Sequence, residues 1–370
     1  MENKNTSPKI RIGITHGDTN GVGYEIIFKA FEDNSLCEFC VPIVYGSAKV
    51  ASYHRKALES SVNYRVISKA DEADAHSLNL LNCMDDEIKV ELGSQSSEAG
   101  RAAFVALERA VADYKAGLID AIVTAPINKA SIQSPSFNFN GHTEYFAERF
   151  GGDPLMVMTG ERMRVALVTT HVPLAAVPGL ITTELVLNKL RIFYNALRSD
   201  FLLPAPRIAV LALNPHGGDD GLLGKEESTA IQPAIEKASA EGISCFGPYA
   251  ADGFFASGAY RKFDGVLAMY HDQGLAPFKA LATSNGVNVT SGLNVVRTSP
   301  DHGTAFDIAG KGVADEASMR HAIYAAIDIF RNRNFDKEGR ANPLPKLYHD
   351  RREDSDRPRR FSPSSADPVE

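Results

Sequence analysis

Five segments of the chain share one pattern, a short run of valine, isoleucine, leucine and alanine followed at once by polar residues, glycine or proline. Such runs are typical of strands buried on both faces, as in a parallel sheet covered by helices. The segments are residues 10–18 (IRIGITHGD), 121–129 (AIVTAPINK), 164–174 (RVALVTTHVPL), 207–219 (RIAVLALNPHGGD) and 265–274 (GVLAMYHDQG). In open α/β sheets ligands bind beyond the carboxyl ends of the strands, so we expect all five polar tips there.

Helical patterns lie between these strands. In the clearest, residues 96–117, apolar residues recur at helical spacing from Ala103 to Tyr114. Ser97 is the expected N-terminal cap, and Gly117 is the expected end of the helix. The alternation of strand and helix predicts an α/β protein, and a length of 370 residues favours two domains over one core.

The end of the chain differs in character from the rest. From Asp336 onward, residues 336–370 hold five prolines, four serines, eight lysines and arginines, and eight aspartates and glutamates. So few apolar positions predict an extended or disordered appendage that does not join the core.

Composition and charge narrow the class of protein. Hydrophobic residues make up 44% and charged residues 23%, as in most globular proteins. The net charge of −7 argues against general nucleic-acid binding, which needs a clear excess of lysine and arginine. The segment MENKNTSPKI lacks the apolar run of a secretory signal, and no segment reaches the length of a membrane span. We therefore expect a cytoplasmic protein without a membrane partner.

The four cysteines predict buried thiols rather than a metal or disulfide framework. Cys37 and Cys40 form a single CxxC pair, and the second pair usual in zinc sites is missing. Four cysteines are also too few to cross-link a chain of this length.

The last three of the five strand tips each carry a histidine: His171, His216 and His271. Three imidazoles could converge on one catalytic metal ion that keeps open positions for substrate or water. Their spacings of 45 and 55 residues match no local metal motif, so three separate loop histidines are an equally open interpretation.

A second group of residues is suited to an anion. Gly141, His142 and Thr143 stand at the start of a predicted amphipathic helix, and free backbone N–H groups at a helix N-terminus suit a phosphate. Thr143 could instead be only a helix cap. Lys279 and Arg297 are candidate counter-charges, and solvated surface charge is the alternative for both.

The first strand tip contains Gly17, Gly21 and Gly23. Their spacing matches neither the dinucleotide fingerprint GxGxxG nor the phosphate loop GxxxxGK[ST]. Tight-turn geometry is sufficient to explain these glycines.

Six motifs together resemble the 4-hydroxythreonine-4-phosphate dehydrogenases of pyridoxal phosphate biosynthesis, over about residues 9–333. They occur in the family's order: TAPINKA, GHTEYFAERFG, VALVTTHVPL, LNPHGGDDGLLGKEE, AMYHDQG and GVNVTSGLNVVRTSPDHGTAFDIAGKG. The resemblance implies an isocitrate/isopropylmalate dehydrogenase-like fold with two α/β domains around a central cleft. Residues 1–140 with 300–335 would form the first domain, 141–299 the second, and 336–370 a charged tail.

The resemblance also implies a homodimer with an active site shared across the interface. The expected metal ligands are His171, His216 and His271, contributed by both subunits. The expected substrate-binding residues are His142, Thr143, Lys279, Asn288 and Arg297, and the expected NAD-binding residues are His302, Gly303, Thr304 and Asp307. Asp252 is the proposed proton acceptor, with a helix cap as its alternative. The first loop departs from the family, because Thr19, Asn20 and Tyr24 stand where Pro, Ala and Pro are usual.

The activity implied by the resemblance is oxidation of 4-phosphooxy-L-threonine by NAD, followed by loss of carbon dioxide to give 3-amino-2-oxopropyl phosphate. A divalent metal, whether zinc, cobalt, magnesium or manganese, would lower the pKa of the substrate hydroxyl and stabilise the developing enolate. Imidazole ligands favour zinc or cobalt over magnesium. D-Threonate or D-erythronate 4-phosphate is the alternative substrate, and a phosphate acyltransferase is a more distant alternative.

Overall fold

The computed structural model describes residues 9–84, 88–281 and 285–341. Its strands form a single sheet in the order β3-β4-β2-β1-β5-β12-β11-β6-β7-β10-β8-β9. The strands are β1 Ile10–Thr15, β2 Cys40–Gly46, β3 Tyr64–Ile67, β4 Leu78–Asn82, β5 Ala121–Thr124, β6 Gly152–Thr159, β7 Arg164–Leu167, β8 Ile208–Leu211, β9 Cys245–Tyr249, β10 Gly265–Ala268, β11 Val287–Leu293 and β12 Arg297–Pro300. All five predicted strands form, as β1, β5, β7, β8 and β10.

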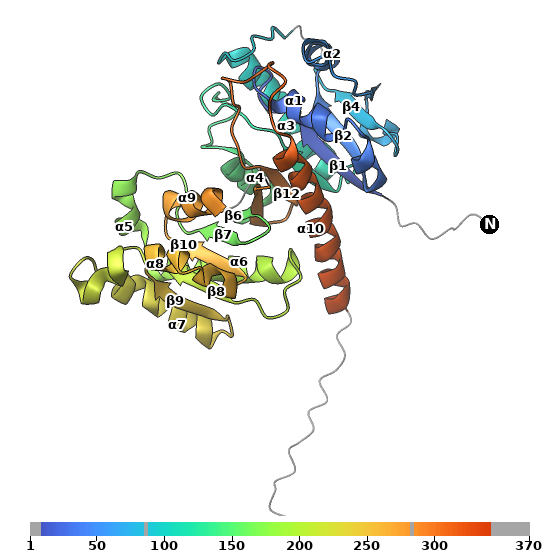
Figure 1. Cartoon of the computed structure of the whole chain (residues 1–370). Coiled ribbons are helices and arrows are strands. Elements are labelled where there is room, and N and C mark those ends of the chain that lie inside the picture. The colour runs from blue at the N-terminus through green and yellow to red at the C-terminus, as the bar shows by residue number, and fades with distance from the viewer. Residues whose placement is uncertain (1–8, 85–87, 282–284, 342–370) are drawn as a thin grey trace, which may run out of the picture.

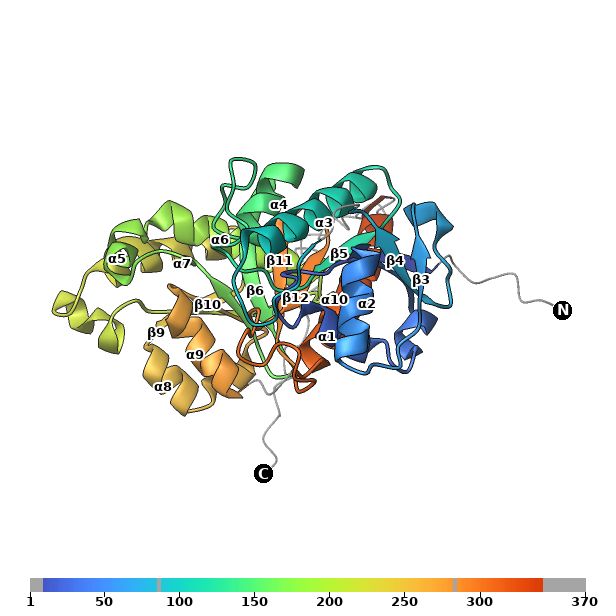
Figure 2. The ribbon, with the colours of Figure 1, turned by 90° about the horizontal axis from the view of Figure 1, so that it is seen from above.

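Helices cover the sheet, and the predicted α/β class is confirmed (Figures 1 and 2). The helices are α1 Gly23–Ala30, α2 Ala48–Ala57, α3 Ser97–Lys115, α4 His142–Phe150, α5 Val177–Leu180, α6 Thr183–Ser199, α7 Gln232–Ala240, α8 Ala251–Ala256, α9 His271–Leu281 and α10 Ala317–Ala341. Short 3-10 or π turns cover Ser35–Glu38, Ala70–Glu72, Leu174–Ala176, Pro215–Gly221, Glu227–Ile231 and Ala259–Lys262. Figure 1 shows two lobes, one containing β1, β2 and β4 and the other containing β8, β9 and β10. Helix α10 lies along their junction and contacts β5, β12, β11 and α6.

The two halves of the sheet run in opposite directions. Strands β1, β2, β5 and β12 are parallel to one another, as are β7, β10, β8 and β9. Between them lie three antiparallel pairings, β12 with β11, β11 with β6, and β6 with β7. The sequence pattern predicted that all five polar tips would line one edge of the sheet. This prediction is wrong, because the two groups of parallel strands point in opposite directions. Hydrogen bonds join neighbouring strands across the whole sheet. The predicted division into two domains stays a prediction.

Helix α3 forms where the pattern predicted it, with a different cap. The Ser96 hydroxyl, rather than that of Ser97, accepts a hydrogen bond from the Ala99 N–H at 3.1 Å. A serine cap requires extended backbone, which Ser96 has, whereas Ser97 is already helical. Gly117 follows the helix with φ +70°, as expected for a glycine that ends a helix.

The glycines of the first loop serve two purposes. Gly17 has φ +76°, the left-handed conformation that favours glycine. Gly21 and Gly23 are needed for close backbone approach, since an added Cβ would lie 2.7 Å from the Thr304 carbonyl oxygen and 2.1 Å from that of His16, respectively. Turn geometry alone therefore explains only one of the three.

The three positions at which this loop departs from the family are buried. The Asn20 side chain donates to the Ser94 carbonyl and the Ser96 hydroxyl, and accepts from the Glu91 N–H. Tyr24 lies between two imidazoles, with ring centroids 5.3 Å from His16 and 4.9 Å from His54. Burial lowers the pKa of each histidine to about 4. This stack of three rings contributes to the core beside the loop.

A buried ion pair joins the two lobes. Asp200, at the end of α6, accepts hydrogen bonds from Nε and Nη2 of Arg333 in α10, at 2.7 and 3.0 Å. Arg333 Nη1 also donates to the backbone carbonyls of Leu293 and Val295. The carboxylate is 2% exposed, so this connection is largely removed from water.

Helix α10 continues past the predicted start of the tail, to Ala341. An ion pair between Asp336 and Arg340, four residues apart on the helix, stabilises this extension. The remainder of the predicted tail, 342–370, lies outside the described residues. Cys37, Cys40 and Cys245 are buried free thiols and Cys83 is partly buried, as predicted. Within the described ranges, no helix combines the length and apolarity needed to cross a membrane.

Candidate active site

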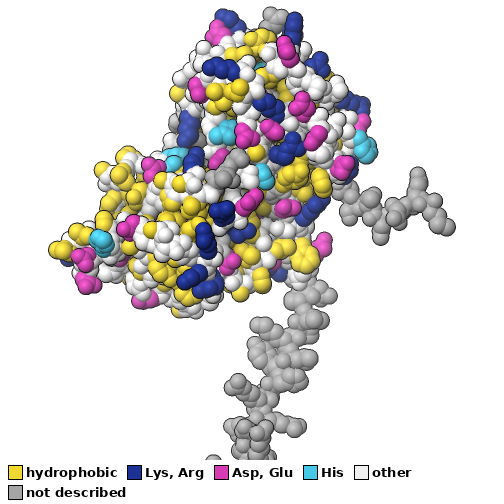
Figure 3. All heavy atoms as spheres, viewed as in Figure 1, with side chains coloured by type: hydrophobic (Ala, Val, Ile, Leu, Met, Phe, Trp, Pro, Cys, Tyr) yellow, Lys and Arg dark blue, Asp and Glu magenta, His cyan; other side chains and the backbone are white. Residues whose placement is uncertain are grey.

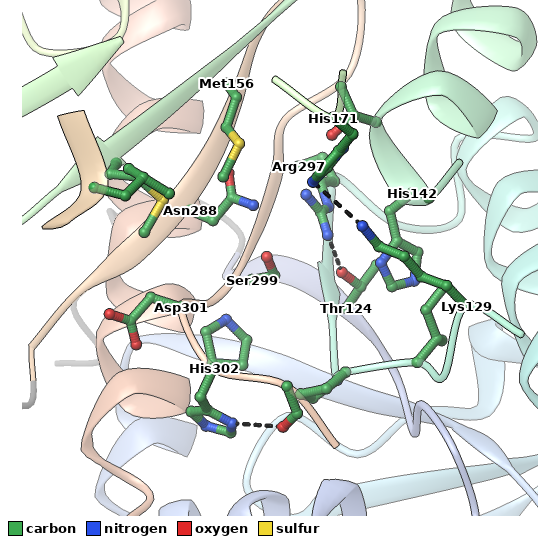
Figure 4. Close-up of a pocket in the computed structure, with 18 of the residues that line it drawn as sticks. Thr124, Lys129, His142, Met156, His171, Asn288, Arg297, Ser299, Asp301 and His302 are labelled. Carbon is green, nitrogen blue, oxygen red and sulfur yellow. Dashed lines mark hydrogen bonds between the residues drawn. The ribbon is translucent and has the colours of Figure 1, made fainter. Parts of the chain in front are cut away.

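A cavity of about 240 Å³ lies where the two halves of the sheet meet (Figure 4). Nine of the residues predicted from sequence line it: His142, Thr143, His171, His271, Lys279, Asn288, Arg297, His302 and Gly303. They come from loops after β7 and β12, from β11 and β12, and from the helices α4 and α9. The antiparallel strands at the centre thus bring together segments that are far apart in the sequence.

Arg297 is the most buried charge at this cavity, with 2% exposure. Its Nη1 donates to Thr290 Oγ1 at 3.1 Å and its Nη2 to Thr124 Oγ1 at 2.6 Å, and its Nε has no partner. No carboxylate lies within ion-pair distance in the part of the chain that the structure describes. Burial lowers the pKa of Arg297 to about 9, a sign that the site disfavours an unpaired cation. An anionic ligand would compensate that charge.

His142 begins helix α4 and lies close to this cation. Burial, followed by the charges of Arg297 and Lys129, holds the pKa of His142 well below its usual value. Its Nε2 is buried without a hydrogen-bond partner. The imidazole is therefore neutral and has a free polar atom at the cavity. Thr143 lies beside it in the first turn and is not the cap, because Gly141 holds that position.

Two further predicted substrate residues reach the cavity from other elements. Asn288 in β11 has a buried side-chain oxygen without a partner. Lys279, near the end of α9, donates through Nζ to the Asp301 carbonyl at 3.1 Å. Arg297, His142 and Asn288 thus all have unsatisfied polar atoms at one cavity, which is the condition for binding a polar ligand.

His171 and His271 lie next to each other at the same cavity, with ring centroids 5.9 Å apart. Lys129 Nζ donates to His171 Nε2 at 3.2 Å, and Glu144 Oε1 lies 4.0 Å from His171 Nδ1. The nearby His171 lowers the pKa of Glu144 more than any other group does, although burial opposes the shift. Two imidazoles and an ionised carboxylate therefore gather at this wall of the cavity.

The third predicted metal ligand, His216, is exposed and does not line the cavity. Among the residues described for this one chain, no group of three or more His, Cys, Asp and Glu side chains is placed to hold a metal ion. The two adjacent imidazoles alone are therefore not a complete set of metal ligands, and the three-histidine metal site stays a prediction. Asp252 is likewise exposed, in the first turn of α8, and its role as proton acceptor stays a prediction.

The predicted NAD residues are divided between the cavity and the first glycine loop. His302 and Gly303 line the cavity, and the buried Nε2 of His302 has no partner. The Thr304 carbonyl accepts a hydrogen bond from the Val22 N–H at 3.1 Å, and Asp307 is exposed. Residues 302–307 thus pack against the first loop at the mouth of the site.

Sequence reasoning missed several residues of the cavity, notably Thr124, Lys129, Glu144 and Asp301. Thr124 and Lys129 belong to the tip of β5, which carries no histidine and was given no chemical role. Glu144 follows His142 and Thr143 directly, within the same quoted motif. Their nearness to Arg297 and His171 depends on contacts between distant segments.

Residues 38–326 match the protein family described as pyridoxal phosphate biosynthetic protein PdxA. The chain belongs to the PdxA family. It is 59% identical over 351 residues to a 4-hydroxythreonine-4-phosphate dehydrogenase of Bacteroides thetaiotaomicron, covering 94% of this chain and 96% of that relative. It is 41% identical over 328 residues to an Oceanobacillus iheyensis protein whose provisional name is D-threonate 4-phosphate dehydrogenase, covering 87% of this chain and 98% of the relative.

Solved structures of PdxA relatives share this fold. The chain matches a 4-hydroxythreonine-4-phosphate dehydrogenase from Burkholderia phymatum with a TM-score of 0.72 and 38% identity, over 87% of this chain and 99% of that one. The same enzyme from Klebsiella pneumoniae gives a TM-score of 0.76 and 33% identity, over 87% and 100%. These matches confirm the predicted α/β fold.

Proposed function

We propose that this PdxA family member oxidises 4-phosphooxy-L-threonine with NAD, and that the resulting 3-keto acid loses carbon dioxide to give 3-amino-2-oxopropyl phosphate. The hydride goes to NAD, and the hydroxyl proton goes to a base, for which Asp252 is our candidate. The family and its named relatives support an oxidoreductase acting on a CH–OH group in pyridoxal phosphate biosynthesis. Membership of this family favours a dehydrogenase over the phosphate acyltransferase alternative.

The main observation that supports a phosphorylated substrate is the buried guanidinium of Arg297. A buried cation without a carboxylate partner is costly unless a ligand supplies the negative charge. Neutral His142 and Thr143, at the N-terminus of α4, stand beside it, and Lys279 adds a second cation at the cavity. Charge-assisted hydrogen bonds from such groups would fix the phosphate and so orient the reacting carbon.

We further propose a divalent metal on His171 and His271, with His216 supplied by a second copy of the chain. When bound, such an ion lowers the pKa of the substrate hydroxyl and stabilises enolate charge during decarboxylation. The adjacent imidazoles and the Lys129 cation already hydrogen-bonded to His171 Nε2 support a cation at this place. The ligand type favours zinc or cobalt, with magnesium and manganese as weaker candidates.

Exposed apolar side chains support the homodimer. Leu174 and Leu222 are 69% and 80% exposed, and Leu180 and Leu223 are exposed as well. They belong to the lobe that contains α5 and the turn Pro215–Gly221, where Figure 3 shows apolar atoms at the surface. Apolar surface of this kind marks protein–protein contacts. Pairing there would cover these leucines and carry His216 toward a second chain.

His302, Gly303, Thr304 and Asp307 remain our candidates for NAD binding, since they connect the cavity to the first glycine loop. A cytoplasmic site of action is part of the same proposal.

Substrate choice is tested by assaying purified protein with NAD, one divalent metal at a time, and two phosphates. We expect NADH formation with 4-phosphooxy-L-threonine. Faster turnover with D-threonate or D-erythronate 4-phosphate would instead establish the alternative, which the Oceanobacillus relative favours. No NADH with any of these phosphates would contradict the dehydrogenase assignment.

A further inference from the structure

His171 lies between two oppositely charged side chains. Its Nε2 is 3.2 Å from Lys129 Nζ, and its Nδ1 is 4.0 Å from Glu144 Oε1. Figure 4 shows the lysine contact as a dashed line at the wall of the cavity. The two partners come from different elements, the loop after β5 and the first turn of α4.

These partners define the hydrogen positions on the imidazole ring. A lysine ammonium can only donate a hydrogen bond and a carboxylate can only accept one. A neutral imidazole has one N–H and one lone pair, so the N–H belongs on Nδ1, facing Glu144, and the lone pair on Nε2, facing Lys129. The nitrogen that can ligate a metal therefore faces a cation already.

Glu144 interacts electrostatically with Lys129 and Arg297 as well as with His171, and it has a free carboxylate oxygen. Its Oε2 is buried without a hydrogen bond, and no lysine or arginine forms an ion pair with it within the described ranges. In metal sites, a carboxylate that accepts the second N–H of a ligating histidine fixes the ring orientation and raises its basicity. Glu144 Oε1 lies 4.0 Å from Nδ1, so it would accept this N–H after an approach of about 1 Å.

We propose that Glu144 is a positioning residue that orients His171 so that Nε2 binds a divalent metal ion, and that the Lys129 ammonium occupies this place when the ion is absent. The inference rests on the proposed metal site. It adds two residues that act on the affinity for the ion and are not themselves ligands. Binding of the metal would displace Lys129 from His171 and free its ammonium for the cavity.

Isothermal titration calorimetry of the metal-free full chain with Zn²⁺ measures the affinity for the ion directly. Glu144→Gln keeps the size of the side chain and should weaken zinc binding by about 10- to 100-fold. Lys129→Met removes the competing cation and should tighten binding by about tenfold. Glu148→Gln, one turn further along α4 on an exposed position, is the matched control and should leave the affinity unchanged.

Titration with Co²⁺ adds a spectroscopic measurement, because its visible absorption reports the ligand geometry. The Glu144→Gln spectrum should differ from that of the wild-type protein, whereas the Glu148→Gln spectrum should not. Equal zinc affinities in wild type and Glu144→Gln, or weaker binding in Lys129→Met, would overturn the inference while leaving the metal site intact. If His171→Ala binds zinc as tightly as wild type, the proposed metal site is wrong, and the role of Glu144 falls with it.

Discussion

Arg333 Nε and Nη2 hold the two carboxylate oxygens of Asp200 at 2.7 and 3.0 Å, and so connect α10 to the end of α6. Removal of one partner from a buried pair leaves the other charge uncompensated. Arg333→Ala should therefore lower the free energy of unfolding by about 3 kcal/mol or more, measured by urea denaturation. Arg331→Ala, two positions earlier, is the control. Equal stability of the two variants would contradict a stabilising role for the pair.

Replacement of Arg297 tests the phosphate site. Hydrogen bonds to charged groups contribute about 1.5 to 3 kcal/mol, so Arg297→Ala should lower kcat/KM for the phosphorylated substrate by roughly ten- to a hundred-fold or more. Arg297→Lys should recover little, because an ammonium cannot reproduce the planar fork that bonds Thr124 and Thr290. A dephosphorylated analogue should be nearly unaffected. If both substrates lose activity equally, Arg297 supports the cavity and does not bind phosphate.

Mixed subunits test the shared metal site. Random pairing of inactive His171→Ala and His216→Ala subunits should restore about a quarter of wild-type activity, since half of the dimers would then carry one intact site. Mixing His171→Ala with His271→Ala is the control and should restore none, because both ligands come from the same chain. Recovery in neither mixture would mean that all three ligands belong to one subunit or that the site does not exist.

The buried stack around Tyr24 predicts a loss of stability in mild acid. Burial lowers the pKa values of His16 and His54 to about 4, so between pH 6.5 and 4 the unfolded chain binds protons that the folded chain does not. Their contribution is complete above pH 6.5 and is lost as the pH falls, by up to about 1.4 kcal/mol per pH unit for each histidine. Urea unfolding at pH 7, 6 and 5 measures this slope.

His54→Gln should make that slope shallower. The same substitution at exposed His76 serves as the control and should leave it unchanged. A slope that is identical in wild type and His54→Gln would show that other groups cause the acid sensitivity.

Removal of residues 342–370 should leave catalysis and thermal stability nearly unchanged, because the helix that packs on the sheet ends at Ala341. A chain that stops after Arg331 loses Asn332 and Arg333, both bonded to Asp200, and should unfold at a clearly lower temperature. Thermal unfolding of the two truncated chains distinguishes them. Similar melting of both would show that these contacts are unimportant.

The sequence predicted those features that depend on neighbouring residues. The five apolar runs became strands, and Gly117 ended α3, because local periodicity and backbone preference decide both. The cap was displaced by one residue, since Ser96 and Ser97 are equally good caps by composition. The reversal of direction between β12 and β7 was not predicted, because it arises from pairings between strands whose polarity no local pattern encodes.

The same limit applies to the site. His171 and His271 were grouped by their positions at strand ends, and the structure places their rings 5.9 Å apart. Glu144 and Lys129 gain their importance only from proximity to His171, across 27 and 42 residues of sequence. His216 does not line the cavity of this chain, so its proposed role depends on a second copy of the chain.

The position of α10 has a consequence for biosynthesis of the protein. Strands β1, β2 and β5 emerge early from the ribosome, yet β12 and α10 complete their side of the sheet only when residues 297–341 have been made. Until then the surface that Met319, Ile323 and Ile327 will cover stays exposed to solvent. The amino-terminal lobe therefore cannot finish folding before residues 297–341 have been made, and nascent chains that stall before residue 297 should be the species that chaperones retain.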